Sequence, residues 1–278
     1  MGHAKTFWTA QERARGRNGA LILRNDDLDA QRCKPELVRG VFEDLKWFGF
    51  EWDEGPDCGG PYGPYNQSER RGFYLDAFAK LLEAGAIYPC RCSRQDVLRA
   101  LSAPHEGEEE PVYPGTCRSS GEGSAPEICD SMLPSLLGRR QGLTDSEVHR
   151  VSWRFRVPDG EEVAFDDGGF GRQRFVAGED FGDFVVWRND DLPAYHLAVV
   201  ADDHAMGISE VVRGEDLLTS TARQLLVYRA LGWNAPKHFH CPLVRDESGQ
   251  RLAKRHDSLS LKVLRESGAE PVELRESW

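Results

Sequence analysis

The sequence predicts an α/β fold in which a parallel sheet is flanked by helices and interrupted by an inserted, β-rich subdomain. Over the first 85 residues, helical patterns alternate with a short apolar run of strand length, a rhythm typical of parallel sheets. Residues 152–176 instead alternate apolar and charged side chains, which predicts short strands. The α/β rhythm returns at Phe184, and 278 residues suffice for two domains or for one domain with an insertion.

The N-terminal part is predicted to contain three helices and one buried strand. Residues 4–16 have a helical pattern, and the apolar run of residues 20–23 has the length of a strand. Pro35 suits the first turn of a second helix. Residues 73–82 predict a third helix, which Gly85 ends.

The later part is predicted to contain two further buried strands and one helix. Residues 184–187 and 197–200 are continuous apolar runs of strand length, and Tyr195 stands at the start of the second strand. Residues 221–231 predict a helix that ends at Gly232.

The composition narrows the class of protein. A formal net charge of −11 argues against a broadly basic nucleic-acid coat but leaves room for a local basic patch. The chain has no apolar run long enough to cross a membrane and no secretory pattern after Met1, so we expect a cytoplasmic protein. Seven cysteines are an odd number spread over the chain, which indicates reduced thiols rather than a disulfide framework.

Four side chains form a candidate metal site. Cys90 and Cys92 are two residues apart, and Tyr113 and Cys117 follow after a polar stretch. Two such thiolates can share one zinc ion, and ligands from across a loop can complete a tetrahedron. The alternative is a set of ordinary thiols with Tyr113 in a core.

Two segments are candidates for binding phosphate. Gly2 and His3 precede a helix, where free N–H groups and the helix dipole favour an anion such as triphosphate. Residues 251–256 are the densest basic cluster of the chain, and Lys254 in it could neutralise charge on a pyrophosphate leaving group. The alternatives are an unstructured N-terminus and a solvated basic face.

A third set of residues is a candidate amino-acid pocket. Asp26 follows a predicted strand, Tyr195 opens another, and Arg213 follows Val211 and Val212 at another strand end. Ligands bind at the C-terminal ends of parallel strands. Asp26 could hold an α-ammonium group, and Arg213 could grip a carboxylate with two hydrogen bonds. Together the three residues suit a small acidic amino acid. Each residue alone could instead be a surface charge or a core tyrosine.

The order of these segments resembles that of class I aminoacyl-tRNA synthetases of the glutamyl group. The end of the HIGH motif is similar to residues 2–6, Gly-His-Ala-Lys-Thr, and the motif L-R-I-E-D-x-D is similar to residues 23–29, Leu-Arg-Asn-Asp-Asp-Leu-Asp. Two later pocket motifs resemble residues 193–203 and 211–218. The KMSKS motif corresponds in place to residues 251–255, Arg-Leu-Ala-Lys-Arg.

The resemblance implies a Rossmann-type parallel sheet with an inserted zinc-binding subdomain. Residues 1–87 and 184–240 would be the two halves of the nucleotide-binding fold, and residues 88–183 the insertion with the zinc site and a subdomain for the tRNA acceptor end. Residues 241–278 would hold the KMSKS-like loop and a helical end without an anticodon-binding domain. That ending resembles the glutamyl-Q tRNA(Asp) synthetase subgroup of the family.

The resemblance also implies an activity and its substrates. ATP, with Mg²⁺, would activate L-glutamate, and the glutamyl group would pass to queuosine at the wobble position of tRNA(Asp). Gly2, His3 and Lys254 would bind ATP, with His3 and Lys254 stabilising phosphate charge as the catalytic pair. A monomer that binds no membrane is expected.

The ligand-binding roles follow in the same way. Glutamate would be held by Asp26, Tyr195 and Arg213. Zinc would be held by Cys90, Cys92, Tyr113 and Cys117, because their spacing is similar to that of the subgroup's zinc site.

Two alternatives and three departures from the family pattern accompany this interpretation. The chain could be a fragment of a glutamyl-tRNA synthetase, which charges the 3′ end of tRNA(Glu), or an inactive zinc- and amino-acid-binding remnant. Asp26 stands where the family has Glu, and Arg251 and Ala253 replace Lys and Ser of KMSKS. The family strand and turn that precede the end of the HIGH motif would lie before Met1, and an open slot beside residues 20–23 would be the structural sign of that missing strand.

Overall fold

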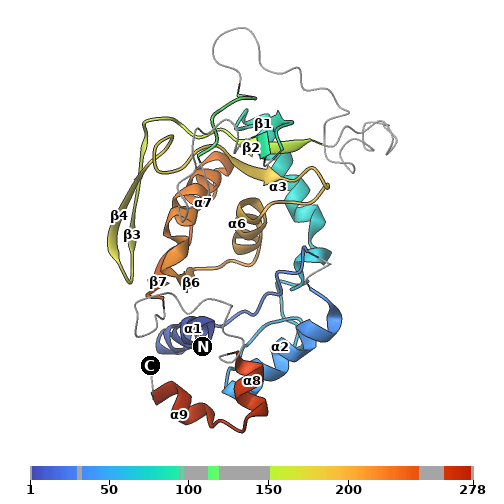
Figure 1. Ribbon diagram of the computed structural model, residues 1–278, viewed down its shortest axis with the longest axis vertical. Helices are drawn as coiled ribbons and strands as arrows, with labels where there is room; N and C mark the ends of the chain where they lie inside the picture. Colours follow the sequence, from blue (N-terminus) through green and yellow to red (C-terminus); the bar gives the residue numbers. More distant parts are fainter. Residues whose placement is uncertain are drawn as a thin grey trace.

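The computed structural model describes residues 2–29, 33–93, 95–96, 112–118, 151–243 and 260–276. Two small sheets and a set of helices form three levels along the long axis of the molecule (Figure 1). One sheet lies at one end, helices α3, α6 and α7 lie beneath it, and helices α1, α2, α8 and α9 lie at the other end. None of the described helices is long and apolar enough to span a membrane.

The helices at the lower end enclose a small core of their own. The helices are α1 (Gly2–Gly16), α2 (Pro35–Phe48), α8 (Leu261–Glu266) and α9 (Pro271–Glu276). Leu45, Phe48 and Phe50 are buried there, with Ala4 of α1. The predicted helices at residues 4–16 and from Pro35 are therefore confirmed.

The predicted strand at residues 20–23 is wrong. The segment is extended, but it makes only isolated bridges, from Ile22 to Glu54 and from Asn25 to Asn66. The reason is that its partner changes: the N–H of Leu23 donates to Glu54, whereas two residues later the N–H of Asn25 donates to the carbonyl of another loop. No continuous ladder can form, and among the described residues no backbone group pairs with the other edge of the segment.

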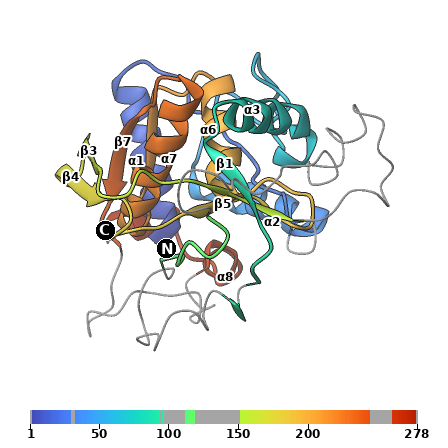
Figure 2. The ribbon, with the colours of Figure 1, turned by 90° about the horizontal axis from the view of Figure 1, so that it is seen from above.

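Three helices cover one face of the first sheet, which is antiparallel. The helices are α3 (Arg71–Glu83), α6 (Tyr195–Ala205) and α7 (Leu218–Leu231), and the strands, in order, are β1 (Ile87–Cys90), β2 (Ser152–Phe155) and β5 (Phe184–Trp187). Seen from above, the three helices lie on the same side of these strands (Figure 2). The predicted helices near residues 73–82 and 221–231 and the strand at 184–187 are confirmed.

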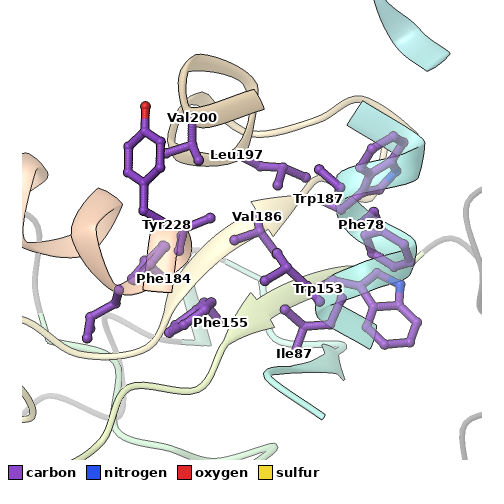
Figure 3. Close-up of a cluster of buried hydrophobic side chains, with 14 of the residues drawn as sticks. Phe78, Ile87, Trp153, Phe155, Phe184, Val186, Trp187, Leu197, Val200 and Tyr228 are labelled. Atoms are coloured by element: carbon purple, nitrogen blue, oxygen red, sulfur yellow. The ribbon is translucent and has the colours of Figure 1, made fainter. Parts of the chain in front are cut away.

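The main core lies between these helices and the sheet. Phe78 of α3 contacts Trp153 edge-on at 5.1 Å between ring centroids, and Trp187 at 5.4 Å. Leu197 and Val200 of α6 and other apolar side chains fill the remaining space (Figure 3). The aromatic side chains supply most of the buried area in such a core.

The predicted strand at residues 197–200 is also wrong, because these residues lie in α6. A short apolar run that is buried on every side has no periodicity to separate a strand from a helix. α6 is such a case: it packs against α3, α7 and β5, and all residues from His196 to Asp202 are buried. Tyr195 therefore opens a helix and not a strand.

The second sheet is mixed rather than parallel. Its order is β4 (Gly171–Val176), β3 (Glu162–Asp167), β7 (Lys237–Cys241) and β6 (Glu210–Gly214). β6, β7 and β3 are parallel, whereas β3 and β4 form a hairpin and must be antiparallel. The hairpin turn packs directly on β7: a Cβ at Gly169 would lie 2.1 Å from the carbonyl oxygen of His240, so only glycine fits.

Helix α1 is fixed to the edge of this sheet by charge. Arg13 Nε donates to Glu210 of β6 at 2.7 Å, and Arg17 contacts the same carboxylate. The guanidinium of Arg13 also stacks over the ring of Phe239 at 3.8 Å.

Replacement of Phe78 by alanine should destabilise the protein strongly. The side chain is fully buried between two tryptophans, so Phe78→Ala leaves a cavity and should lower the free energy of unfolding by about 3–5 kcal/mol. Urea unfolding measures the change. Phe73→Ala on the same helix is the control, because Phe73 is exposed, and it should change stability by about 1 kcal/mol or less. Equal effects of the two substitutions would contradict this account of the core.

Candidate active site and cysteine cluster

A buried ion pair lies at the centre of the candidate site. Arg70 Nε donates to Oδ1 of Asp202 at 2.5 Å, and neither side chain reaches solvent. The second oxygen, Oδ2, accepts from Gln67 Nε2 at 2.8 Å and from the hydroxyl of Tyr74 at 3.0 Å. Three side chains from the 67–74 region thus satisfy one carboxylate of α6.

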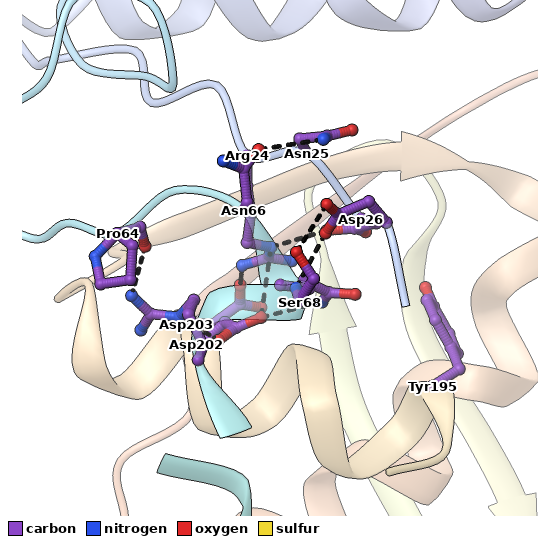
Figure 4. Close-up of polar contacts among 12 residues, drawn as sticks. Arg24, Asn25, Asp26, Pro64, Asn66, Ser68, Tyr195, Asp202 and Asp203 are labelled. Carbon is purple, nitrogen blue, oxygen red and sulfur yellow. Dashed lines mark hydrogen bonds and ion pairs between the residues drawn. The ribbon is translucent and has the colours of Figure 1, made fainter. Parts of the chain in front are cut away.

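Arg24 extends this pair into a network of charges (Figure 4). Its Nε donates to Asp26 at 2.9 Å, its Nη1 donates to Asp203 at 2.7 Å, and Asp202 lies 3.5 Å away. Burial opposes the charge of Arg24, but the three carboxylates hold its pKa well above the ordinary value. Burial raises the pKa of Asp203, against the opposing effect of Arg24. Arg24 was not predicted as a site residue, although it lies inside the motif that contains Asp26.

The backbone on both sides of Asp26 is held by side chains. Asp27 accepts from the N–H and from the hydroxyl of Ser68, each at 2.8 Å, and Asn25 donates to Asn66 at 3.0 Å. These contacts anchor the turn while the side chain of Asp26 stays 48% exposed. Asp26 is therefore presented by a fixed turn and remains accessible to a ligand.

Arg213 lies near the end of β6 among neutral polar groups. Its Nη1 donates to the hydroxyl of Tyr195 at 3.4 Å, and its Nη2 donates to Thr221 at 2.6 Å and to Gln224 at 2.8 Å. Its Nε donates to Nε2 of His240 at 3.2 Å. The structure thus brings Tyr195 and Arg213 together, as the sequence predicted, and adds three residues that the sequence analysis missed.

His240 is itself bound to a buried carboxylate. Its Nδ1 lies 2.6 Å from Oδ2 of Asp167, and neither side chain is exposed. Burial raises the pKa of Asp167, but the hydrogen bonds from the His240 side chain and from three backbone N–H groups more than offset this and leave the pKa below its usual value. Burial lowers the pKa of His240. The hydrogen bond to Asp167 opposes this effect and the charge of Arg213 adds to it, so that the pKa lies below its usual value.

Three buried polar atoms near Arg213 have no hydrogen-bond partner among the described residues. They are Nδ1 of His196, Nε2 of Gln224 and the hydroxyl of Tyr228. Burial and the charges of Arg223 and Arg213 lower the pKa of His196 to about 3. Such atoms are costly to bury without partners. Their grouping around Arg213 indicates a place for a polar ligand.

The candidate phosphate-binding residues are only partly described. Gly2 begins α1, and His3 is exposed in its first turn, with its ring stacked on that of Phe7 at 6.4 Å. Lys254 and the rest of the basic cluster at residues 251–256 lie outside the described residues.

Three cysteines meet as the sequence predicted. The Sγ atoms of Cys90, Cys92 and Cys117 all lie within 4.8 Å of one another. Tyr113 lies among them, with its hydroxyl 3.4 Å from Cys90 Sγ and 3.5 Å from Cys92 Sγ. The six described cysteines are free thiols, and Cys129 lies outside the described residues.

The thiols of this cluster differ in acidity. Burial raises the pKa of Cys92 to about 11 and raises that of Tyr113. Burial opposes ionisation of Cys117 too, but hydrogen bonds from the Arg91 N–H and from Tyr113 lower its pKa overall. Arg154 adds a positive charge, since its Nε lies 3.3 Å from Cys90 Sγ.

Comparison with known proteins identifies the family. A sequence model described as tRNA synthetases class I (E and Q), catalytic domain, matches residues 1–277. The chain belongs to this family. Within the family it is a class I catalytic domain of mixed α/β architecture, a ligase-type enzyme.

Two relatives match nearly the whole chain. A glutamyl-Q tRNA(Asp) synthetase of Symbiobacterium thermophilum is 46% identical over 98% of this chain and 79% of its own length. Another of that name, from Nitratidesulfovibrio vulgaris, is 44% identical over 96% of this chain and 78% of its own length. A crystal structure of the glutamate-tRNA synthetase of Elizabethkingia anophelis is 29% identical with a TM-score of 0.74. The match covers 93% of this chain but about half, 51%, of that synthetase.

Loss of the buried carboxylate of Asp202 should destabilise the protein. Asp202→Ala leaves Arg70 charged and buried without its partner, so we expect the free energy of unfolding to fall by about 3–5 kcal/mol. The control is Asp190→Ala, which removes a surface pair with Arg188 and should cost about 1 kcal/mol or less. Chemical denaturation of both variants tests the difference, and similar losses would show that the network around Asp202 is unimportant.

Proposed function

We propose that this chain activates L-glutamate with ATP and transfers the glutamyl group to queuosine at the wobble position of tRNA(Asp). The proposal rests on groups of opposite charge on the two sides of the site. Arg213, which contacts Tyr195, supplies the positive charge on one side. The carboxylates of Asp26 and Asp203 supply the negative charge on the other side. Such a pair of opposite charges suits an acidic amino acid. The names of the two relatives at 46% and 44% identity support the acceptor.

In this proposal the two ends of glutamate are bound by different groups. Arg213 and Tyr195 bind the side-chain carboxylate, and Asp26 binds the α-ammonium group. Asp26 is one methylene shorter than the family Glu, and it shares its charge with Arg24 at 2.9 Å. Asp203, which Arg24 also contacts, adds negative charge on the same side. Arg24 therefore moderates the attraction that the acidic side has for the ammonium group.

The proposed reaction has two steps. An oxygen of the α-carboxylate of glutamate attacks the α-phosphorus of ATP, and pyrophosphate leaves. A hydroxyl of the queuosine cyclopentene ring then attacks the carbonyl carbon of glutamyl-adenylate, and AMP leaves. Gly2, His3 and Lys254 bind the phosphates, with Mg²⁺ accompanying ATP. The work is positioning and charge stabilisation.

The domain division predicted from the sequence is part of the proposal. A Rossmann-type nucleotide-binding fold is made of residues 1–87 and 184–240, with residues 88–183 as the insertion and 241–278 as the KMSKS-like end. In this proposal the protein binds tRNA(Asp) as a monomer.

We also propose that the cysteine cluster holds a structural zinc ion. The residues fit this group: a tetrahedral site with Zn–S bonds of about 2.3 Å places sulfur atoms about 3.8 Å apart. Cys92 Sγ and Cys117 Sγ are 3.5 Å apart. Tyr113 would supply the fourth ligand beside Cys90. When bound, zinc would link β1 to residues 112–118 and so stabilise the fold there.

A second candidate function is attachment of glutamate to the 3′ end of a tRNA. The match to the glutamate-tRNA synthetase of Elizabethkingia anophelis favours it. The acceptor nucleoside distinguishes the two functions. Labelled glutamate should appear in the anticodon of tRNA(Asp) that contains queuosine, and label found only at a 3′ end would refute the first proposal.

Arg213 should govern the affinity for glutamate. Arg213→Gln removes the charge that binds the side-chain carboxylate, so the KM for glutamate in glutamate-dependent pyrophosphate exchange should rise about 30-fold or more. The KM for ATP should change little. Arg172→Gln, at an exposed pair on β4, is the control and should leave both constants unchanged. An unchanged KM for glutamate in Arg213→Gln would contradict the assignment.

The zinc proposal is tested by metal content and stability. We expect about one zinc ion per purified chain by elemental analysis. Cys117→Ser should lower that content, and chelation should lower the melting temperature of the unsubstituted protein. Cys58→Ser, which changes an exposed thiol outside the cluster, is the control. A zinc content near zero in the unsubstituted protein would overturn the proposal.

A further inference from the structure

One edge of the Arg213 guanidinium is fully occupied by protein groups. Nε donates to His240 at 3.2 Å, and Nη2 donates to Thr221 at 2.6 Å and to Gln224 at 2.8 Å. The other edge, with Nη1, faces the hydroxyl of Tyr195, a side chain that is 43% exposed. Only Nη1 is therefore directed toward the accessible part of the site.

The group that accepts from Nε is itself tightly held. His240 lies 2.6 Å from Oδ2 of Asp167 through Nδ1. Oδ1 of Asp167 accepts from the backbone N–H groups of Gly169 and Phe170, each at 2.9 Å. Neither Asp167 nor His240 has an exposed side chain. The carboxylate cannot rotate without breaking these bonds, so the imidazole ring has one orientation.

The hydrogen bonds also determine where the proton of His240 lies. A carboxylate only accepts, so Nδ1 of His240 must carry the proton that points at Asp167. The Nε of an arginine only donates, so Nε2 of His240 must be bare to accept from Arg213. The hydroxyl of Thr221 also lies 3.1 Å from Nε2, so its proton can go to that bare nitrogen or to the carbonyl of Leu217 at 3.1 Å. In both cases its oxygen remains able to accept from Arg213. One neutral tautomer satisfies every partner.

We propose that Asp167 and His240 are positioning residues that orient Arg213 for the carboxylate of its ligand. The inference rests on the proposed function, in which Arg213 binds glutamate. Asp167 selects the tautomer of His240, the bare Nε2 holds Nε of Arg213, and the guanidinium plane is thereby fixed with Nη1 toward Tyr195. Preorganisation of this kind lowers the cost of ordering a side chain when the ligand binds.

Asp167→Asn tests the inference because it keeps the shape of the side chain and changes the tautomer. The backbone N–H groups of Gly169, Phe170 and His240 all donate to Oδ1 and retain the amide oxygen there, so the amide N–H₂ takes the place of Oδ2 and faces Nδ1 of His240. The bond from the His240 N–H to Oδ2, at 3.2 Å, is lost. Nδ1 must then accept, the proton moves to Nε2, and two donors face each other at Arg213. We expect the KM for glutamate in pyrophosphate exchange to rise about tenfold, the effect of losing one hydrogen bond to a charged group, with less than a twofold change for ATP.

The tautomer is read directly by ¹⁵N NMR of the histidine side chains. The unsubstituted protein should have the proton of His240 on Nδ1, and Asp167→Asn should have it on Nε2. A merely structural role of Asp167 would lower the melting temperature without this change. A proton on Nε2 in the unsubstituted protein would overturn the inference.

Two further comparisons separate the positioning role from a loss of folding. His240→Gln supplies an oxygen that can accept from Arg213, and it should retain more glutamate affinity than His240→Met, which has no such acceptor. Asp166→Asn, an exposed neighbour paired with Arg172, is the control for Asp167→Asn and should change nothing.

The measurements distinguish a failure of the proposed function from a failure of the positioning role. If Arg213→Gln leaves the KM for glutamate unchanged, the proposed function fails, whereas a tautomer change in Asp167→Asn together with a shift of the Arg213 Nε signal still supports the positioning role. If Arg213→Gln raises that KM but Asp167→Asn and His240→Met do not, the positioning role is refuted and the proposed function stands.

Discussion

The buried ion pair between Arg70 and Asp202 is the contact on which the candidate site depends. Both charges lie out of reach of water, so only protein groups stabilise them. Gln67 and Tyr74 complete the hydrogen bonds of the carboxylate, and the carbonyl groups of Tyr62 and Pro64 accept from the guanidinium. The turn, α3 and α6 therefore have to assemble together, because any one of them alone would leave a charge without a partner.

The two sides of the site differ in how their charges are compensated. Asp26 shares its charge with Arg24, which also contacts Asp203 and lies close to the buried pair. Among the described residues, the hydrogen-bonding partners of Arg213 are neutral polar groups, including Tyr195 and His240, whose pKa is lowered chiefly by burial. The positive charge of Arg213 is thus the less compensated of the two. An anionic group should be attracted to this side of the site more strongly than a cationic group to the other.

The sequence predicted those features that depend on local chemistry. Gly232 takes a left-handed conformation and ends α7 as expected, and Tyr195 contacts Arg213. The prediction failed where long-range packing determines the secondary structure. Residues 197–200 were predicted as a strand but lie in a helix that is buried on every side. Residues 20–23 form no strand because the segment changes partner after a single bridge. His240 and Asp167 were missed because their contact joins two strands of one sheet and follows no periodicity of the sequence.

The distance along the chain between the partners in the charged network has a consequence for folding. Arg70 and Asp202 are 132 residues apart, and Asp167 and His240 are 73 residues apart. Contacts between such distant residues require the closure of long loops, which slows folding. Contacts that form only after the transition state slow unfolding rather than accelerate folding. These long-range contacts would then act chiefly by slowing unfolding, so that the lifetime of the native state depends on the same residues as the geometry of the site.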